Sequence, residues 1–99
     1  RRKLLRSLAS SAILYERIET TFSNARAVKP YLEKLITRAK VDSLHNRRQL
    51  LSKLTRNATA KALEVYGPRY VDRSGGYLRL TKLNNPKAGA SKAVLEFVE

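Results

Sequence analysis

The sequence contains no cysteine and a single histidine, His45. Without cysteine, the chain has no disulfide, no thiolate nucleophile and no cysteine ligand for a metal ion. With one histidine, neither a histidine-based metal site nor a Ser/His/Asp triad can be assembled in the usual way. The eight carboxylates are scattered along the chain. These absences predict a protein that is not an enzyme, with no catalytic residue, no metal, no other cofactor and no small-molecule substrate.

Long apolar runs are also absent. No stretch approaches the ~20 apolar residues that a membrane-spanning helix needs, and no signal peptide is recognisable. We therefore expect no membrane partner. Methionine is missing too, and the chain opens on three basic residues, so we expect that it begins inside a longer gene product and that a basic N-terminal extension precedes it.

Acidic residues are scarce relative to basic ones. Twenty-one Lys and Arg stand against eight Asp and Glu, which gives a net charge of +13. Such an excess destabilises a compact state by self-repulsion unless a polyanion neutralises it. The balance therefore favours nucleic acid or another anionic surface as the partner.

Ninety-nine residues is the size of one domain, so we expect a single domain over residues 1–99. Hydrophobic periodicity predicts four helices and three strands in it. The helices are expected at residues 1–15, 24–39, 44–54 and 58–66, the strands at 17–22, 77–83 and 92–98, and a long loop at 84–91. The order α-β-α-α-α-β-β is typical of an α+β domain with its helices packed on one face of a small three-stranded sheet.

Local signals set the expected ends of these elements. Ser23 or Asn24 is the expected cap of the second helix, and Pro30 is expected to kink or break that helix. Gly67-Pro68 is expected to end the fourth helix. The third helix is expected to turn four leucines inward: Leu44, Leu50, Leu51 and Leu54. The outer face of the second helix is expected to carry Lys34, Arg38 and Lys40.

The stretch YGPRYVDRSGGYLRL, residues 66–80, combines three tyrosines, three arginines and three glycines. Arginines can hold phosphates through paired hydrogen bonds, and tyrosines offer ring faces and hydroxyls. The Gly75-Gly76 pair leaves room for backbone amides to approach a sugar–phosphate chain. It does not fit a phosphate-binding glycine signature, because no Lys-Ser/Thr follows and the next element is a strand. Tyr66 and Tyr70 also fit a half-buried position at the end of a helix.

Other basic residues add to this stretch. Arg47 and Arg48 point about 100° apart on a helix and cannot both face the core, although this alone also fits a solvated face. Cations crowd the start of the first helix, where they oppose the helix dipole, and this indicates an external anion. We predict the following RNA-binding residues: Arg1, Arg2, Lys3, Arg6, Arg47, Arg48, Arg69, Tyr70, Arg73, Ser74, Gly75, Gly76, Tyr77, Arg79, Lys82 and Lys87.

Four segments resemble a known family, the bacterial large-subunit ribosomal proteins numbered seventeen. They are YERIETT (15–21), EKLITRAK (33–40), NRRQLL (46–51) and YGPRYVDRSGGYLRLTKL (66–83), in this order and spacing. The resemblance covers essentially the whole chain. It implies an α-β-α₃-β₂ fold and a structural role in the large ribosomal subunit, in the cytoplasm or in an organelle. It also implies binding to large-subunit rRNA near the nascent-chain exit region, and contact with a small ribosomal protein numbered thirty-two.

The chain departs from the family pattern near its start. Arg6-Ser7-Leu8 stands where the family has Arg-Asn-Leu, and Tyr15 stands in place of a histidine, so contacts made by those side chains are not carried over. The basic N-terminal tail of the family is absent, and Arg1-Arg2-Lys3 would be its root.

Two other functions stay open. A DNA-binding regulator would use residues 44–54 and 58–66 as a helix-turn-helix, although 58–66 has one lysine and no Asn, Gln or Arg to read bases. A protein that binds anionic lipid would lay residues 1–15 on a membrane, although the Ala/Ser-rich centre of that segment offers little bulk for insertion.

Overall fold

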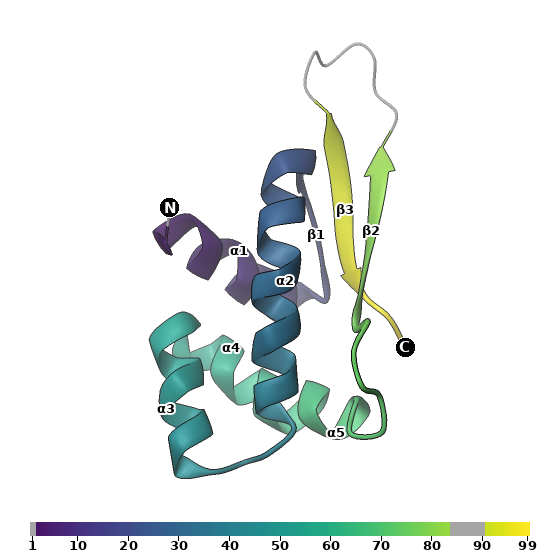
Figure 1. The fold of residues 1–99 in the computed structure, drawn as a ribbon. Coiled ribbons are helices and arrows are strands. Elements are labelled where there is room, and N and C mark those ends of the chain that lie inside the picture. The colour runs from purple at the N-terminus through teal and green to yellow at the C-terminus, as the bar shows by residue number, and fades with distance from the viewer. Residues whose placement is uncertain (1, 84–90) are drawn as a thin grey trace.

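The computed structural model describes residues 2–83 and 91–99. Its elements follow in the order α1 (Arg2–Tyr15), β1 (Arg17–Thr21), α2 (Phe22–Ala39), α3 (Leu44–Lys53), α4 (Arg56–Lys61), the π-helical turn η1 (Ala62–Tyr66), α5 (Gly67–Arg69), β2 (Leu78–Leu83) and β3 (Lys92–Phe97). The helices gather on one face of the sheet (Figure 1). The predicted α+β class and element order are therefore confirmed. The predicted loop over 84–91 lies, except for Ser91, outside the described residues.

The sheet has the strand order β1-β3-β2, and both strand pairs are antiparallel. β3 is the most apolar strand and takes the centre. Ile18, Leu95 and Leu80 are partners in the register and form one row on the face that α2 covers. Val94 points to the opposite face of the sheet, yet it is only 4% exposed. Its position in the central strand explains this, because cross-strand neighbours on both sides cover it.

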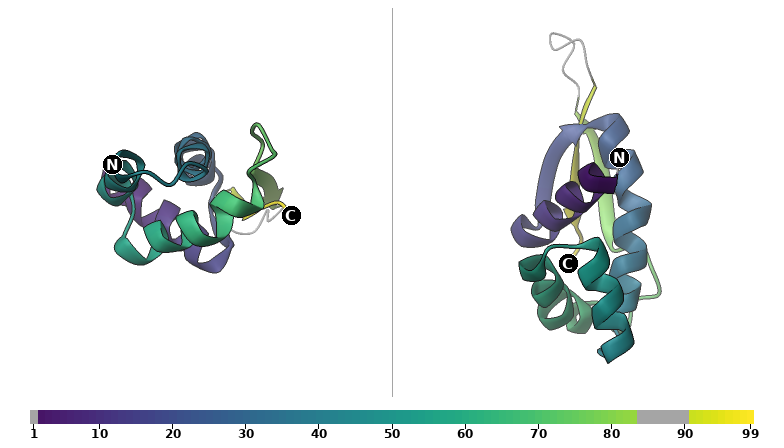
Figure 2. Two further views of the ribbon diagram at one scale, coloured as in Figure 1. Left: turned by 90° about the horizontal axis from the view of Figure 1, so that it is seen from below. Right: turned by 90° about the vertical axis from the view of Figure 1, so that its left-hand side faces the viewer.

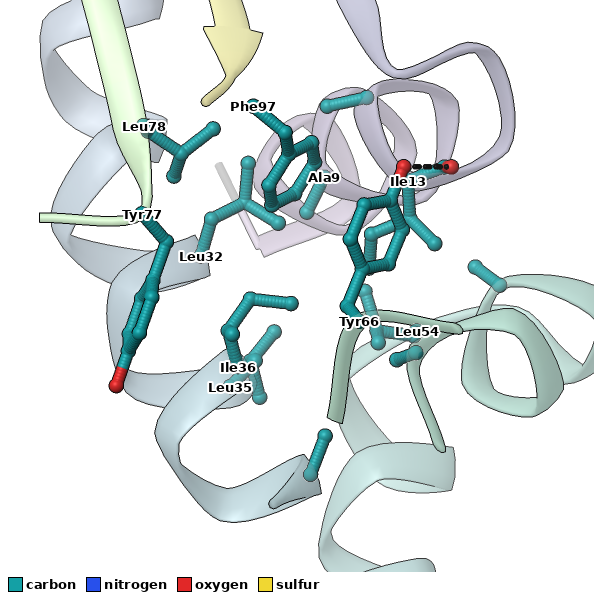
Figure 3. Close-up of a cluster of buried hydrophobic side chains, with 14 of the residues drawn as sticks. Ala9, Ile13, Leu32, Leu35, Ile36, Leu54, Tyr66, Tyr77, Leu78 and Phe97 are labelled. Carbon is teal, nitrogen blue, oxygen red and sulfur yellow. Dashed lines mark hydrogen bonds between the residues drawn. The ribbon is translucent and has the colours of Figure 1, made fainter. Parts of the chain in front are cut away.

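Helix α2 stands between the sheet and helices α1 and α3. In both Figure 1 and Figure 2, α1 and α3 lie on one side of α2 and the sheet lies on the other. Buried side chains from all these layers meet in one cluster, where Figure 3 shows Leu32 of α2 close to Phe97 of β3. The core therefore ties the first helix to the last strand.

The C-terminal end of α1 is capped by side chains from the helical segment 56–69. The last carbonyls of a helix have no partner within the helix. The Tyr66 hydroxyl donates to the carbonyl of Ile13 at 2.8 Å (Figure 3), and Lys61 Nζ donates to the carbonyl of Leu14 at 2.9 Å. The Tyr66 ring also stacks on Phe97, with 4.2 Å between ring centroids. Tyr66 thus links α1 to the sheet.

Helix α2 begins earlier than expected and is not broken. Thr21 is its cap, since the Thr21 hydroxyl accepts a hydrogen bond from the amide of Asn24 at 3.2 Å. Pro30 lies inside the helix, and the prediction of a break there is wrong. Pro30 and Arg26 are both exposed. The carbonyl of Arg26, which loses its partner at the proline, therefore lies on a face that water can reach, and this lowers the cost of the proline.

The fourth predicted helix does not end at Gly67-Pro68, so that prediction is also wrong. The helical run continues to Arg69 through a wide turn, in which the Gly67 amide bonds to the carbonyl of Ala62. A Cβ built on Gly67 would lie 2.5 Å from the carbonyl oxygen of Ala39. Glycine is therefore needed here for close packing against the end of α2.

We expect the substitution Gly67→Ala to destabilise the fold by about 1–3 kcal/mol, because the added methyl group would collide with a backbone atom. A thermal melt followed by circular dichroism measures this. Gly75→Ala is the matched control, since a Cβ at Gly75 meets nothing within 4 Å. Equal melting temperatures for the two variants would contradict the packing role of Gly67.

Helix α3 buries fewer leucines than predicted. Leu50 and Leu54 are fully buried, but Leu44 is 65% exposed and Leu51 is 45% exposed. α3 lies at the edge of the helical layer (Figure 1) and packs mainly against α2 and α4. Its buried stripe is therefore narrow.

Candidate nucleic-acid interface

The two layers of the molecule differ sharply in charge. The helical segments 2–15 and 22–69 hold 14 Lys and Arg against 3 Asp and Glu. The strands and their connections, at 16–21, 70–83 and 91–99, hold 5 of each sign. The positive charge of the described chain is thus concentrated in the helical layer, and the sheet layer is close to neutral.

The loop between α5 and β2, residues 70–77, is anchored at both ends. Tyr70 and Tyr77 are 2% and 0% exposed, and their ring centroids are 5.0 Å apart. Burial raises the pKa of Tyr70 above its ordinary value. The Glu33 carboxylate accepts hydrogen bonds from the amides of Tyr77 and Leu78, at 3.1 and 3.2 Å. These contacts give the two tyrosines a role in the core, so we do not include them in an RNA-binding surface.

Between these anchors, residues 73–76 form an exposed turn. Lys40 Nζ and the Tyr77 hydroxyl both donate to the carbonyl of Arg73, whose own guanidinium donates to the carbonyl of Gly76 at 3.2 Å. Gly76 has φ = 66°, in the left-handed region that favours glycine. Within the described part of the chain, the amides of Ser74, Gly75 and Gly76 donate to no protein acceptor. The turn therefore presents backbone donors to an external anion.

A hollow of about 510 Å³ adjoins this turn. It lies between Ser74 and Gly75, the second half of α2 and the start of α3. Lys34 and Arg38 of α2 supply its positive charge, and Asn46 of α3 lines it as well. The Glu33 carboxylate also lines it, but both of its oxygens accept amide hydrogen bonds. Cationic side chains and free backbone amides together form a candidate phosphate-binding surface.

Lys34 and Arg38 were not among the predicted RNA-binding residues. The structure brings them together with the turn at Ser74 and Gly75, which were predicted to bind RNA. The signal was present in the sequence: two cations at i and i+4 lie next to each other on a helix. What the sequence lacked was the position of the turn beside them.

Arg69 is not the free surface cation that we expected. Its guanidinium lies 2.9 Å from a carboxylate oxygen of Glu16, and it sits over the rings of Tyr66 and Tyr70, 4.9 and 5.8 Å from their centroids. Its side chain is 30% exposed. Arg69 therefore links the end of α5 to the turn between α1 and β1, and its charge is largely used inside the protein.

On α3, the two adjacent arginines differ. Arg47 makes two hydrogen bonds to the Asp42 carboxylate, at 2.6 and 2.9 Å. This pairing lowers the pKa of Asp42 and raises the pKa of Arg47 relative to their ordinary values. The Arg48 side chain is exposed and makes no hydrogen bond or ion pair with any described residue. Arg48 is thus the freer of the two for contact with an anion.

The remaining predicted residues are dispersed. Arg2 and Lys3 are exposed at the start of α1, and Arg6 donates to the carbonyl of Leu54 at 3.3 Å. Arg79 is exposed on the outer face of the sheet, 3.9 Å from Glu96, and Lys82 Nζ lies 5.0 Å from the ring centroid of Phe22. Arg1 and Lys87 lie outside the described residues. The structure therefore does not join Arg79 to the surface around Lys34.

Several structural features are absent from residues 2–83 and 91–99. No helix in these ranges is long and apolar enough to cross a membrane, and no group of three His, Asp or Glu is placed to hold a metal ion. Lys61 is the lone basic residue of segment 58–66, and its amine bonds to the carbonyl of Leu14. The segment therefore has no free cation with which to read DNA.

Comparison with known proteins gives a consistent result. The family model described as Ribosomal protein L17 matches residues 4–98. Relatives include proteins named large ribosomal subunit protein bL17. The one from Acidobacterium capsulatum is 44% identical over 99% of this chain and 62% of its own length. Those from Solibacter usitatus and Thermodesulfovibrio yellowstonii are both 46% identical, over 99% and 100% of this chain and 67% and 76% of their own lengths. The chain thus spans about two thirds of the length of these relatives.

Proposed function

Because the chain belongs to the ribosomal protein L17 family, we propose that it is a structural constituent of the large ribosomal subunit in the cytoplasm, where it binds and stabilises folded rRNA. The match of the family model to residues 4–98 is the observation that carries this proposal. The concentration of positive charge in the helical layer supports the RNA contact.

In this proposal the RNA backbone lies against the helical layer and the turn at residues 73–76. Lys34, Arg38 and Arg48 neutralise phosphates, and the free amides of the turn donate to phosphate oxygens. Arg2 and Lys3 extend the contact at the start of α1.

Recognition by shape suits this surface. Among the described residues, no aromatic side chain projects from the outer face of the sheet, where it could stack on a row of bases. A-form RNA is recognised mostly by shape and by backbone contacts. We therefore infer that the chain selects a folded rRNA segment over a single strand of equal length.

The outer face of the sheet fits a protein partner better than RNA. Its central row places Glu96 between Arg17 and Arg79, so neighbouring charges offset one another. We infer that this face meets neighbouring proteins of the subunit, among them the small protein numbered thirty-two that the resemblance implies.

Sedimentation tests the proposal. A tagged copy of the chain, expressed in a bacterium, is expected to sediment with the large subunit and not with the small subunit after ribosomes are dissociated on a gradient. The tag fused to an unrelated basic protein of similar size is the control for charge alone. If the tagged chain stayed at the top of the gradient, the proposed function would be wrong.

A further inference from the structure

A second hollow lies on the opposite side of Lys34 and Arg38. Its volume is about 370 Å³, within the range of roughly 300–1,000 Å³ that ligand pockets occupy. α1 lies beside the upper half of α2 as drawn in Figure 1 and α3 beside its lower half, both on the side away from the sheet (Figures 1 and 2), and residues of all three helices line the hollow. This hollow is separate from the one at the turn 73–76.

The lining combines an apolar floor with a basic rim. Pro30, Tyr31 and Leu35 of α2 form much of the floor, together with Leu5 of α1. The Tyr31 hydroxyl donates to the carbonyl of Lys53 at 2.8 Å, which fixes the ring between α2 and α3. The position of the ring is thus set before any ligand arrives.

The rim consists of Lys34, Arg38 and Lys53. Lys34 and Arg38 line the hollow at the turn as well, so these two side chains form a basic ridge between the two hollows. None of the three makes a side-chain hydrogen bond or an ion pair with a described residue. A ligand with a flat apolar group and a negative charge could pack its apolar group on the floor and pair its charge with the basic rim.

We propose that this hollow binds one unpaired nucleotide of the folded rRNA, with the base on the floor formed by Pro30 and Tyr31 and its phosphate on the ridge of Lys34 and Arg38. The inference rests on the proposed function, because it takes RNA as the partner. Specific RNA recognition mostly targets bulges and loops, whose bases can leave the stack and lie on aromatic side chains. A fully paired stem has no unpaired base to place in the hollow. The hollow therefore gives this chain a preference for bulged RNA over fully paired RNA, which charge alone does not give.

The test compares two RNA hairpins that are identical except for one unpaired adenosine in the stem. The full chain is expected to bind the bulged hairpin about 10-fold more tightly than the paired one, a modest value for the stacking of one base on an aromatic ring. Binding is measured by titration with fluorescently labelled RNA at a fixed salt concentration.

Three variants separate the hollow from general charge. Ala27→Leu fills the hollow without changing any charge, since Ala27 lines it, and is expected to abolish the preference for the bulge. The double variant Lys34→Gln, Arg38→Gln is expected to lose the preference and to bind both hairpins more weakly. The matched control Arg26→Gln, Lys29→Gln removes the same charge from α2 outside the hollow and is expected to keep the preference. Thermal melts confirm that each variant folds.

The outcomes distinguish this inference from the proposed function. If the chain binds both hairpins equally, the nucleotide site is wrong and the proposed function stands. If Ala27→Leu folds and keeps the preference, the bulge is recognised elsewhere and the site is again wrong. If neither hairpin binds, both the site and the RNA-binding function fail. Displacement of the bulged hairpin by an equal concentration of an acidic peptide would assign the hollow to a protein segment and overturn the nucleotide site.

Discussion

The affinity of the chain for folded large-subunit RNA is expected to fall by about 10³–10⁵ when salt rises from 50 to 200 mM, if six to ten phosphates are neutralised. These values are calibrated on duplex DNA, whose binding releases condensed counterions in the same way. The physical reason is the excess positive charge of the helical layer, which contains 14 basic and 3 acidic residues. Titrations at a series of salt concentrations give the slope of log affinity against log salt. Binding that hardly changes with salt would contradict a phosphate-based contact.

Two arginines of the same segment provide an internal control. Arg73→Ala is expected to lower the salt slope by about one unit, since among the described residues the exposed Arg73 side chain bonds only to a carbonyl of its own turn. Arg69→Ala is expected to lower the melting temperature, because it removes the Glu16 ion pair and the stacking on Tyr66. A variant Arg73→Ala that melts early but keeps the full slope would show that Arg73 has a structural role.

The order of elements followed from hydrophobic periodicity because each buried stripe is a local property of its segment. Whether a tyrosine lies in the core or on the surface, by contrast, is not determined by its neighbours in the sequence. Tyr70 and Tyr77 were predicted at the RNA surface, yet their rings pack together in the core and the Tyr70 hydroxyl bonds to the carbonyl of Val98. Nothing near them in the sequence indicates that partner, which is 28 residues away from Tyr70. Their burial depends on the tertiary fold.

The local geometry at Gly67 and Glu16 could not be predicted from the sequence either. Gly67 was predicted to end a helix, but its lack of a side chain instead allows close packing against the carbonyl of Ala39. Glu16 has φ = 67°, a left-handed conformation that costs a residue with a side chain roughly 1–2 kcal/mol. The Arg69 ion pair and the bond from the Phe97 amide to the Glu16 carbonyl hold it there. In both cases a partner distant in sequence decides the local geometry.

The candidate interface likewise has a part that could be predicted from the sequence and a part that depends on the tertiary fold. The exposed turn at Ser74 and Gly75 could be predicted, since serine and glycine are among the residues that dominate turns. The ridge of Lys34 and Arg38 could be predicted only as a pair of neighbouring cations. That this pair lies between two hollows depends on how α1, α3 and the turn pack around α2.

The substitution Tyr66→Ala is expected to have the largest effect on stability of any single change considered. It removes a fully buried ring that stacks on Phe97, and large-to-small changes of this kind cost about 3–5 kcal/mol. A domain of this size is stable by about 5–15 kcal/mol in total. Each kcal/mol lowers the melting temperature by about 4–8 °C, so the variant is expected to be largely unfolded at growth temperature if the parent stability is at the low end.

Tyr66→Phe separates the ring from the hydroxyl. The phenylalanine keeps the stack on Phe97 but leaves the carbonyl of Ile13 without its donor, which is expected to cost about 1–3 kcal/mol. Because Tyr66 is fully buried, neither variant should change RNA affinity per folded molecule. The measurement is urea unfolding followed by circular dichroism, with RNA titrations corrected for the folded fraction. If Tyr66→Ala unfolded at the same urea concentration as the parent chain, Tyr66 would not link α1 to the sheet. A lower RNA affinity of folded Tyr66→Phe would place the end of α1 in the interface.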